Sequence, residues 1–414
     1  HEEASGIKYV PKAIIDKWKK KDPIASFEKY IVGEKILSKK QISDIEKTIK
    51  SNIDDSIDFA LNSEFPISSI EDELGDVFKE SKIRDEMQSN KTKSLRFVDA
   101  ISNGLSIMMD KDDKIILLGQ DIAEYGGVFK VTEGMFNKYP DRVLNTPIIE
   151  SGILGASMGL ALKGYKPIVE MQFSDFASCG FNQIVNNIAK NHYRWGESIN
   201  VTIRMPSGGG IAAGPFHSQT SEAWFFHVPG IKIVYPSNPV DAKGLLISSI
   251  NDPNPVMFFE HKGLYRSIKE DVCEDYYSTP IGSGKIVKEG TELSIITYGQ
   301  AVHWAIDILK DYHKKGVNIE IVDLRSLVPW DKSLVEESIK KTNKVLILHE
   351  ANLSGGVGSD IAAHISEHFF EYLDAPVLRV ASLDTPIPFS KNIENDIYLP
   401  LTRIKNKIDY LLKY

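Results

Sequence analysis

The chain has 414 residues and a mass of 46.3 kDa, so at about 100 to 200 residues per domain it is long enough for two domains and an additional segment. Apolar residues make up 42% and charged residues 26%, a balance that excludes a disordered chain, a collagen and a coiled coil. Lys and Arg total 49 against 57 Asp and Glu, which gives a net charge of −8 and argues against nucleic acid as a partner.

The cysteine content and the hydropathy restrict the compartment. Cys179 and Cys273 cannot form a disulfide framework in so long a chain, and neither has the spacing of a zinc site, so a reducing compartment fits best. No apolar stretch reaches the roughly 18 residues that cross a bilayer. We therefore expect a soluble protein without a membrane partner, in the cytoplasm or, in a eukaryote, in the mitochondrial matrix. The opening residue is His1 and not Met, and no signal-peptide pattern follows, so we expect that an N-terminal portion is missing.

Residues 1–92 are polar and carry helical patterns at 43–53 and 57–61 without a core of their own. They predict a helical tail or linker. From Ser94 onward, segments of helix length and strand length alternate with short turns, which is typical of parallel sheets.

Two blocks of alternation are visible. The first predicts strands at 114–118, 143–149, 166–173, 199–205, 232–235 and 256–260, with helices at 96–109, 175–193, 221–226 and 239–250. The second predicts strands at 293–298, 319–323, 344–349 and 377–380, with helices at 301–313, 334–341 and 357–372. The polar stretch 262–280 between them is expected to connect two domains.

The expected fold is therefore α/β, with two open parallel-sheet domains and an N-terminal helical tail. We place the boundaries at 1–92, 93–275 and 276–414. In such domains ligands bind at the carboxyl ends of the strands.

Glu150 follows an apolar strand and precedes a helix of small residues that could pack against a flat ligand. A desolvated carboxylate there has a raised pKa and can hold a strong hydrogen bond to a ring nitrogen. An equally good interpretation is that Glu150 lies near the positive end of that helix and stabilises it.

His217 lies on a loop after a strand, where a histidine is suited to proton transfer or to binding an anion, although most such histidines are structural. Gln172 and Phe176 follow another strand and could face one ligand, or only pack in the core. The segment 207–210, Ser-Gly-Gly-Gly, lacks the spacing of a phosphate loop and predicts a flexible wall. Ser218 has no acidic partner nearby, so a Ser-His-Asp hydrolase is weakly supported.

Several motifs in order resemble one family. Leu118-Gly-Gln-Asp-Ile-Ala-Glu-Tyr-Gly-Gly-Val-Phe-Lys-Val-Thr132, Asn145-Thr-Pro-Ile-Ile-Glu-Ser-Gly152, Phe216-His-Ser-Gln219 and Val322-Asp-Leu-Arg-Ser-Leu-Val-Pro-Trp-Asp331 resemble the β subunit of thiamine-diphosphate-dependent 2-oxo acid dehydrogenases. The likeness covers residue 94 to the end. Residues 1 to about 80 resemble the carboxyl-terminal end of the α subunit, notably Lys8-Tyr-Val-Pro11 and Lys21-Asp-Pro-Ile24, as in a fused α-β polypeptide.

The resemblance implies a pyrimidine-binding domain, a transketolase-like C-terminal domain and specific site residues. It implies that Glu150 hydrogen-bonds the pyrimidine ring nitrogen of thiamine diphosphate and favours its imino tautomer. Phe176 then stacks on this ring and Gln172 is the neighbouring polar position. His217 is implied near the substrate carboxylate and in reductive acylation. His1 is implied to be a catalytic residue, namely the histidine of the α-subunit active-site loop.

The resemblance also implies metals and partners. A structural potassium ion is expected near Thr202, Asp252 and Asn254. Magnesium and the diphosphate bind to a Gly-Asp-Gly…Asn-Asn motif in the α part of the family, but here Gly75-Asp76 is followed by Val77. We therefore expect an α-type region, upstream or on another chain, an α2β2-like assembly, and a lipoylated acyltransferase as partner.

The predicted function is oxidative decarboxylation of a 2-oxo acid with acyl transfer to a lipoyl group. Residues 258–266, Phe-Phe-Glu-His-Lys-Gly-Leu-Tyr-Arg, and 217–223, His-Ser-Gln-Thr-Ser-Glu-Ala, favour a branched-chain acid, 3-methyl-2-oxobutanoate, over pyruvate. The alternatives are a pyruvate dehydrogenase of the same type, a transketolase-like enzyme that acts on sugar phosphates, and a non-catalytic subunit that only holds an assembly together.

Overall fold

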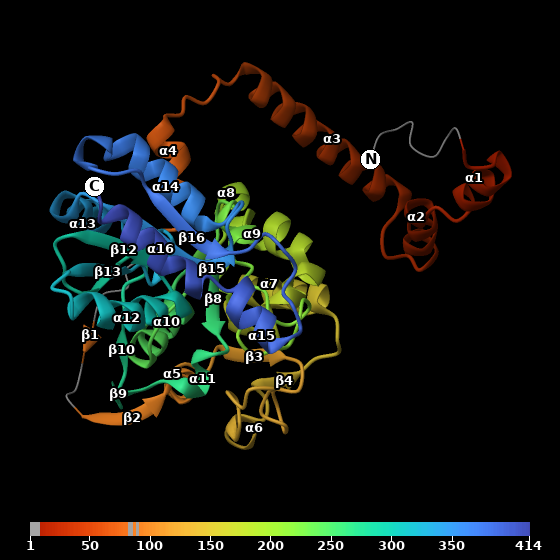
Figure 1. Cartoon of the computed structure of the whole chain (residues 1–414). Coiled ribbons are helices and arrows are strands. Elements are labelled where there is room, and N and C mark those ends of the chain that lie inside the picture. The colour runs from red at the N-terminus through yellow and green to blue at the C-terminus, as the bar shows by residue number, and fades with distance from the viewer. Residues whose placement is uncertain (1–8, 82–85, 88–90) are drawn as a thin grey trace. The chain divides into compact units, whose positions relative to one another are not determined.

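The computed structural model describes residues 9–81, 86–87 and 91–414, and Figure 1 gives their arrangement within each part of the chain. His1 lies outside the described residues. The chain divides into two compact units, 1–69 and 70–414. No described helix is long and apolar enough to cross a membrane.

The first unit consists of α1 (Lys12–Lys19), α2 (Pro23–Gly33) and α3 (Lys39–Asn62). The Asp22 carboxylate caps α2 by accepting from two backbone amides, and a Ser38–Gln41 capping box starts α3. None of the residues in these helices is buried, in agreement with a segment that has no core of its own. The helical patterns at 43–53 and 57–61 belong to the single helix α3.

The larger sheet in the second unit has the strand order β14-β7-β8-β6-β5-β3-β4. Its strands are β3 (Ile115–Gly119), β4 (Val143–Asn145), β5 (Lys166–Glu170), β6 (Thr202–Ser207), β7 (Lys232–Val234), β8 (Val256–His261) and β14 (Ser326–Val328). All neighbours are parallel except β14 and β7. The edge strand β14 was not predicted, and it comes from the carboxyl-terminal third of the sequence.

The second sheet has the order β11-β13-β12-β15-β16. Its strands are β11 (Lys285–Lys288), β12 (Leu293–Thr297), β13 (Ile319–Asp323), β15 (Val345–Asn352) and β16 (Leu378–Ser382), and only β11 is antiparallel to its neighbour. The α/β class with open, mostly parallel sheets is thus confirmed, with one antiparallel edge strand in each sheet as a difference.

Helices cover both sheets (Figure 1). Those of the first sheet are α5 (Phe97–Lys111), α6 (Met135–Lys138), α7 (Glu150–Leu162), α8 (Asn191–Trp195), α9 (Glu222–Phe226), α10 (Pro239–Asn251) and α11 (Leu264–Ser267). Those of the second are α12 (Gln300–His313), α13 (Lys332–Thr342), α14 (Val357–His368), α15 (Lys391–Ile393) and α16 (Leu401–Leu411), with a 3-10 turn at Phe370–Tyr372 and a π-helix at Glu394–Tyr398. The short helix α4 (Ile70–Gly75) starts the unit.

The segment 262–280 does more than connect two domains. It forms β9 (Lys269–Cys273), which pairs with β2 (Thr92–Arg96), and β10 (Tyr277–Ser278), which pairs with β1 (Glu86–Met87). The polar composition that predicted a linker thus reflects an antiparallel ribbon, in which the exposed residues 269–271 pair with residues 94–96 of β2.

The helix predicted at 175–193 is broken into a 3-10 helix (Ser174–Gly180), a π-helix (Gln183–Ile188) and α8. Packing explains the first break. Gly180 lies so close to α7 that a Cβ atom there would be 2.2 Å from a methyl carbon of Leu154. The local helical pattern is therefore overridden by contact with the neighbouring helix.

One hydrophobic cluster joins the two sheets. It contains Ile203 and Met257 from the first sheet and Ile296 and Ile347 from the second, all essentially inaccessible to solvent. The opposite face of the first sheet is covered by α5 and α10, where Leu105 is fully buried. Residues 70–414 are consequently built around a shared core.

Candidate active site

The site begins where β3 and β5 end. These strands are parallel neighbours, and Gly119 lies opposite Glu170 at their carboxyl ends. The residues that follow, Asp121 and Gln172, therefore lie close together, and the Gln172 Nε2 donates a hydrogen bond of 3.3 Å to Asp121 Oδ2. Both side chains belong to the edge of the sheet where open α/β folds bind ligands.

Glu150 is the first residue of α7 and is half-buried. The predicted strand at 143–149 stops at Asn145, because Pro147 has no backbone donor and begins a tight turn to Ile149. The Gln120 Nε2 donates to Glu150 Oε1 at 3.2 Å. The carboxylate lies in the first turn of a 13-residue helix, where the dipole favours negative charge, so the stabilising role considered for Glu150 is also compatible with its position.

The 3-10 helix that carries Phe176 packs on the first turn of α7. The Ser151 hydroxyl donates to the carbonyl oxygen of Cys179 at 2.7 Å, which holds the two segments together. The half-buried ring of Phe176 is thus positioned beside the helix end that begins with Glu150.

His217 joins this group through aromatic contacts. Its half-buried ring meets those of Phe173 and Phe176 edge-on, with centroid separations of 4.8 and 5.5 Å. The structure therefore brings Gln172, Phe176 and His217 together at the carboxyl edge, next to the start of α7. Phe173 and Gln120 were missed as neighbours, although Gln120 lies in one of the motifs that carried the resemblance and Phe173 directly follows Gln172.

The loop that leads from β6 to His217 is tethered, which contradicts the prediction of a flexible wall. Backbone amides of Gly209, Gly210 and Ala212 donate to the buried carboxylates of Glu350 and Glu394. Nothing in the local glycine pattern indicated these partners, because both carboxylates lie more than a hundred residues further along the chain.

Comparisons with known proteins decide the family. Residues 93–268 match the pyrimidine-binding domain of transketolase, and residues 282–404 match the transketolase C-terminal domain. The chain is 44% identical over 324 residues to the 2-oxoisovalerate dehydrogenase subunit beta 2, mitochondrial, of Arabidopsis thaliana, covering 77% of this chain and 88% of that protein.

Two bacterial relatives agree. The 2-oxoisovalerate dehydrogenase subunit beta of Bacillus subtilis is 42% identical, covering 72% of this chain and 93% of that protein. The pyruvate dehydrogenase E1 component subunit beta of Staphylococcus aureus is 39% identical, covering 77% and 97%. The chain belongs to the family of 2-oxo acid dehydrogenase β subunits.

The resemblance noted in the sequence is thus confirmed for the β region, whereas the comparisons do not show a fusion with an α subunit. A solved split-gene transketolase, described as an inactive β4 tetramer, shares the fold with a TM-score of 0.64 at 23% identity, covering 77% of this chain and 98% of that one. The family is thiamine-diphosphate-dependent.

The site fits the aminopyrimidine half of this cofactor. A half-buried carboxylate, an amide and a half-buried aromatic ring, from Glu150, Gln172 and Phe176, offer a hydrogen-bond acceptor, a polar contact and a stacking surface. Ser218 supports no hydrolase, since its buried hydroxyl has no hydrogen-bond partner among the described residues.

Buried charges underlie the site. Arg204 of β6 is 1% exposed and binds Glu260 through two hydrogen bonds of 2.7 and 2.8 Å, and it also binds Glu170. Burial raises the pKa of Glu170.

A buried lysine lies near the aromatic rings of the site. Burial lowers the pKa of Lys262 to about 8, although the Asp175, Glu350 and Glu394 charges oppose this shift. The Lys262 ammonium lies 5.4 Å from the centroid of the Phe173 ring.

The side chains predicted to hold potassium are arranged differently. One oxygen of Asp252 accepts a hydrogen bond of 2.7 Å from the Lys232 ammonium. Its other oxygen accepts hydrogen bonds from the backbone amide and the side-chain amide of Asn254. Thr202 is buried without a hydrogen-bond partner for its hydroxyl among the described residues. Because both Asp252 oxygens are engaged, these side chains do not fit a potassium ion as arranged, and the potassium site stays a prediction.

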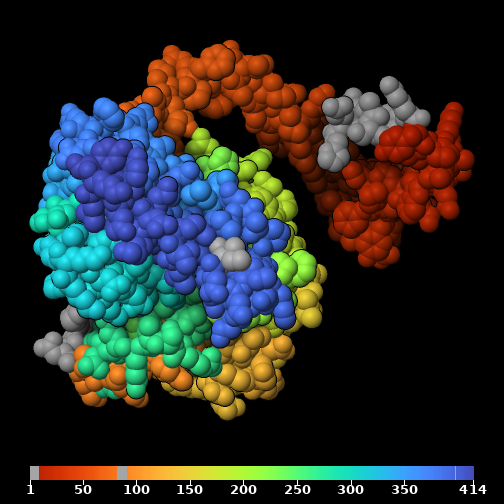
Figure 2. Space-filling model, viewed as in Figure 1, coloured from red at the N-terminus to blue at the C-terminus, as the bar shows by residue number. Residues whose placement is uncertain are grey.

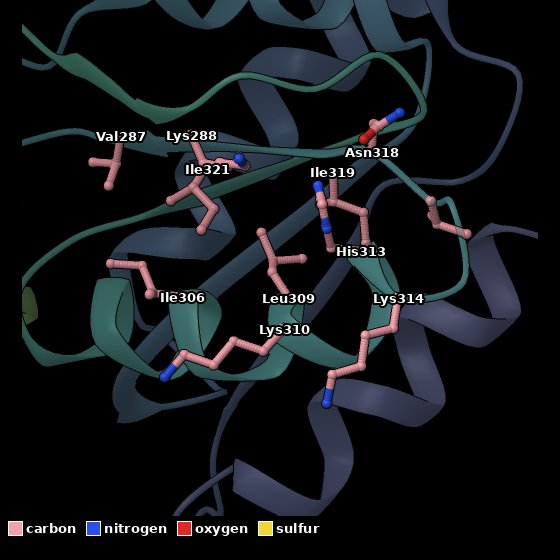
Figure 3. Close-up of a pocket in the computed structure, with 11 residues that line it drawn as sticks. Val287, Lys288, Ile306, Leu309, Lys310, His313, Lys314, Asn318, Ile319 and Ile321 are labelled. Atoms are coloured by element: carbon pink, nitrogen blue, oxygen red, sulfur yellow. The ribbon is translucent and has the colours of Figure 1, made fainter.

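A separate cavity of about 500 Å³ lies between α12 and the strands β11 and β13. Figure 3 shows apolar side chains such as Leu309 and Ile321 around it, while the amino groups of Lys310 and Lys314 point away. None of the predicted site residues lines this cavity.

Proposed function

We propose that this chain, with an α-type region, oxidatively decarboxylates a 2-oxo acid and passes the acyl group to the lipoyl group of an acyltransferase. The α-type region is an upstream part of the same polypeptide or a separate chain, in an α2β2-like assembly. The observation that carries the proposal is the convergence of Gln172, Phe176 and His217 beside the start of α7, at the edge where the strands end.

The α-type region is needed because this chain offers only half of a cofactor site. Its sequence contains no Gly-Asp-Gly, and no cluster of three His, Cys, Asp or Glu suited to a metal is found among the described residues. Magnesium and the diphosphate must then be held by the α-type region. Exposed apolar residues beside Glu150, namely Ile148 and Ile149 at 84% and 53%, are suited to burial against such a partner.

The residues of this chain have distinct tasks in the proposed reaction. When bound, thiamine diphosphate supplies the nucleophilic carbon and the electron sink for decarboxylation. Glu150 holds a proton between its carboxylate and the pyrimidine nitrogen, and Phe176 orients the ring by stacking. In this proposal His217 binds the substrate carboxylate and moves a proton during acyl transfer. The acid loses carbon dioxide, and its remaining fragment is oxidised to an acyl group. The lipoyl disulfide is reduced at the same time: one sulfur takes the acyl group as a thioester, and the other becomes a thiol.

A branched-chain substrate is proposed. The two relatives named for 2-oxoisovalerate, which is 3-methyl-2-oxobutanoate, are 44% and 42% identical, against 39% for the one named for pyruvate. This difference agrees with the branched-chain character of the motifs at 217–223 and 258–266.

The test is a substitution at Glu150 in the chain assembled with its α-type region, thiamine diphosphate and magnesium. Glu150→Gln keeps the shape but not the negative charge, so decarboxylation of 3-methyl-2-oxobutanoate should fall by about 100-fold or more. Exposed Glu197→Gln is the control and should leave the rate unchanged. Near-normal turnover by Glu150→Gln would reject the role of Glu150, a preference for pyruvate would reject the substrate, and an assembly inactive on both acids would reject the function.

A further inference from the structure

A carboxylate from the carboxyl-terminal domain binds the loop 208–217. Glu394 is fully buried at the start of a π-helix, and its two oxygens accept hydrogen bonds of 2.8 Å from the backbone amides of Gly210 and Ala212. Bonds to an ionised acceptor are about twice as strong as those between neutral groups. Both oxygens of one side chain are thus used to fix two amides of the same loop.

A second carboxylate binds the preceding residue. Glu350 of β15 accepts a hydrogen bond of 2.6 Å from the backbone amide of Gly209 and one of 2.7 Å from His261 Nε2. Since His261 Nδ1 accepts from the backbone amide of Gly263, the ring carries a proton on Nε2 and donates it to Glu350. Burial by itself would raise the pKa of the Glu350 carboxyl, but His261, the Gly209 amide and the Lys262 charge together hold this pKa below its usual value.

The same carboxyl-terminal segment reaches the part of the loop next to His217. Gly214 has a φ of +72°, and a Cβ atom there would lie 2.9 Å from a ring carbon of Phe389. The backbone amide of His217 in turn points at the carbonyl oxygen of Gly214, at 3.4 Å. Figure 2 shows blue segments near the carboxyl terminus against yellow-green segments from the part of the chain that forms the first sheet. The contacts therefore continue from Gly210 almost to the histidine.

We propose that Glu394 is a positioning residue, which holds the loop 208–217 so that His217 meets the Phe173 and Phe176 rings. This inference rests on the proposed function for the role of His217, but the tethering of the loop does not. Among the described residues, the Glu394 side chain hydrogen-bonds only backbone amides of the loop, so it acts through the loop and not on the substrate.

The experiment uses Glu394→Gln in the complete assembly. The amide NH2 of glutamine would face one of the two backbone donors, so one hydrogen bond is replaced by a clash of donors while the shape is kept. We expect hydrogen exchange of the peptide 208–217 to accelerate about tenfold. Acyl transfer to a lipoylated domain should show a kcat lowered by about tenfold, whereas decarboxylation with ferricyanide as acceptor should stay within about threefold.

Two further variants complete the design. Asp396→Asn lies in the same π-helix with an exposed side chain and should leave exchange and both rates unchanged. Glu394→Asp keeps the charge but is one methylene too short to reach both amides, and it replaces Glu394→Gln if that variant does not fold.

The outcomes separate the two proposals. Unchanged exchange in the loop would overturn the tethering by Glu394. Faster exchange with unchanged acyl transfer would overturn its role in positioning His217. A wild-type assembly that decarboxylates neither 3-methyl-2-oxobutanoate nor pyruvate would reject the proposed function, while the exchange measurement would still decide whether Glu394 holds the loop.

Discussion

Glu222 of α9 is a fully buried carboxyl group whose charge is poorly compensated. One oxygen accepts a hydrogen bond of 2.8 Å from the Tyr298 hydroxyl, and the other has no hydrogen-bond partner among the described residues. Burial raises its pKa from 4.5 to about 7. The folded state therefore holds the proton more tightly than the unfolded state, and stability is lost as the pH rises from 4.5 through 7.

Glu222→Gln should remove this loss. A shift from 4.5 to about 7 corresponds to about 3 kcal/mol, so the substitution should flatten the decline of the melting temperature between pH 5 and pH 8. Thermal melts of both proteins across that range provide the measurement, with exposed Glu197→Gln following the wild type. Parallel pH profiles for Glu222→Gln and wild type would contradict a raised pKa at Glu222.

Residues of the candidate site differ in how far the sequence could reveal them. Glu150 and His217 could be selected because they lie within recognisable motifs, and Gln172 and Phe176 because they follow a buried strand. Glu394 could not be found, since its partners are loop amides 182 and 184 residues away, and any residue type can supply a backbone amide.

At the scale of elements, β14 carries an interaction between the two halves of the sequence. It follows β13 of the second sheet directly but pairs with β7 of the first, with Ser326 opposite Val234. Arg325, just before it, binds Asp241 at 2.9 Å and the carbonyl oxygen of Gly284 at 3.0 Å. Leu327 of β14 is fully buried in the cluster that joins both sheets.

Leu327→Ala should therefore destabilise residues 70–414 as one unit. Loss of a buried leucine side chain costs about 2 to 5 kcal/mol, so we expect a clearly lower melting temperature with a single calorimetric transition. Leu401→Ala, at a position that is 36% exposed, should have a much smaller effect. Two resolved transitions, with only the carboxyl-terminal domain unfolding early, would show that the shared core does not couple the sheets.

Most strands of the two large sheets were predictable as short apolar runs, whereas β11 and β14 were not. Both are antiparallel edge strands of three or four residues, and pairing with a distant partner determines them more than local composition does. Tertiary contact likewise divides the predicted helix 175–193, because the close approach of Gly180 to Leu154 requires a tighter turn there than an α-helix provides.

For the whole molecule, the two units should contribute unequally to stability. Every residue of the described hydrophobic clusters lies between residues 95 and 412, and no residue of α1, α2 or α3 is buried. These helices therefore gain little from apolar burial within the chain. Residues just after these helices are bound to the core. The backbone amide of Lys79 donates to the buried Asn254 Oδ1 at 2.7 Å, and Asn254 Nδ2 donates to the carbonyl oxygen of Lys79 at 2.8 Å.

Two truncations test this division. Removal of residues 1–69 should leave the melting temperature within about 2 °C of the full chain, because the core is untouched. Removal of residues 1–81 also takes away Phe78, whose ring centroid lies 5.7 Å from the Lys232 ammonium, and both bonds of Lys79. At about 1 kcal/mol for each lost hydrogen bond, this longer truncation should lower the melting temperature by several degrees. Equal melting temperatures for the two truncations would mean that residues 70–81 add nothing, and a large loss on removing residues 1–69 alone would mean that the first unit stabilises the second.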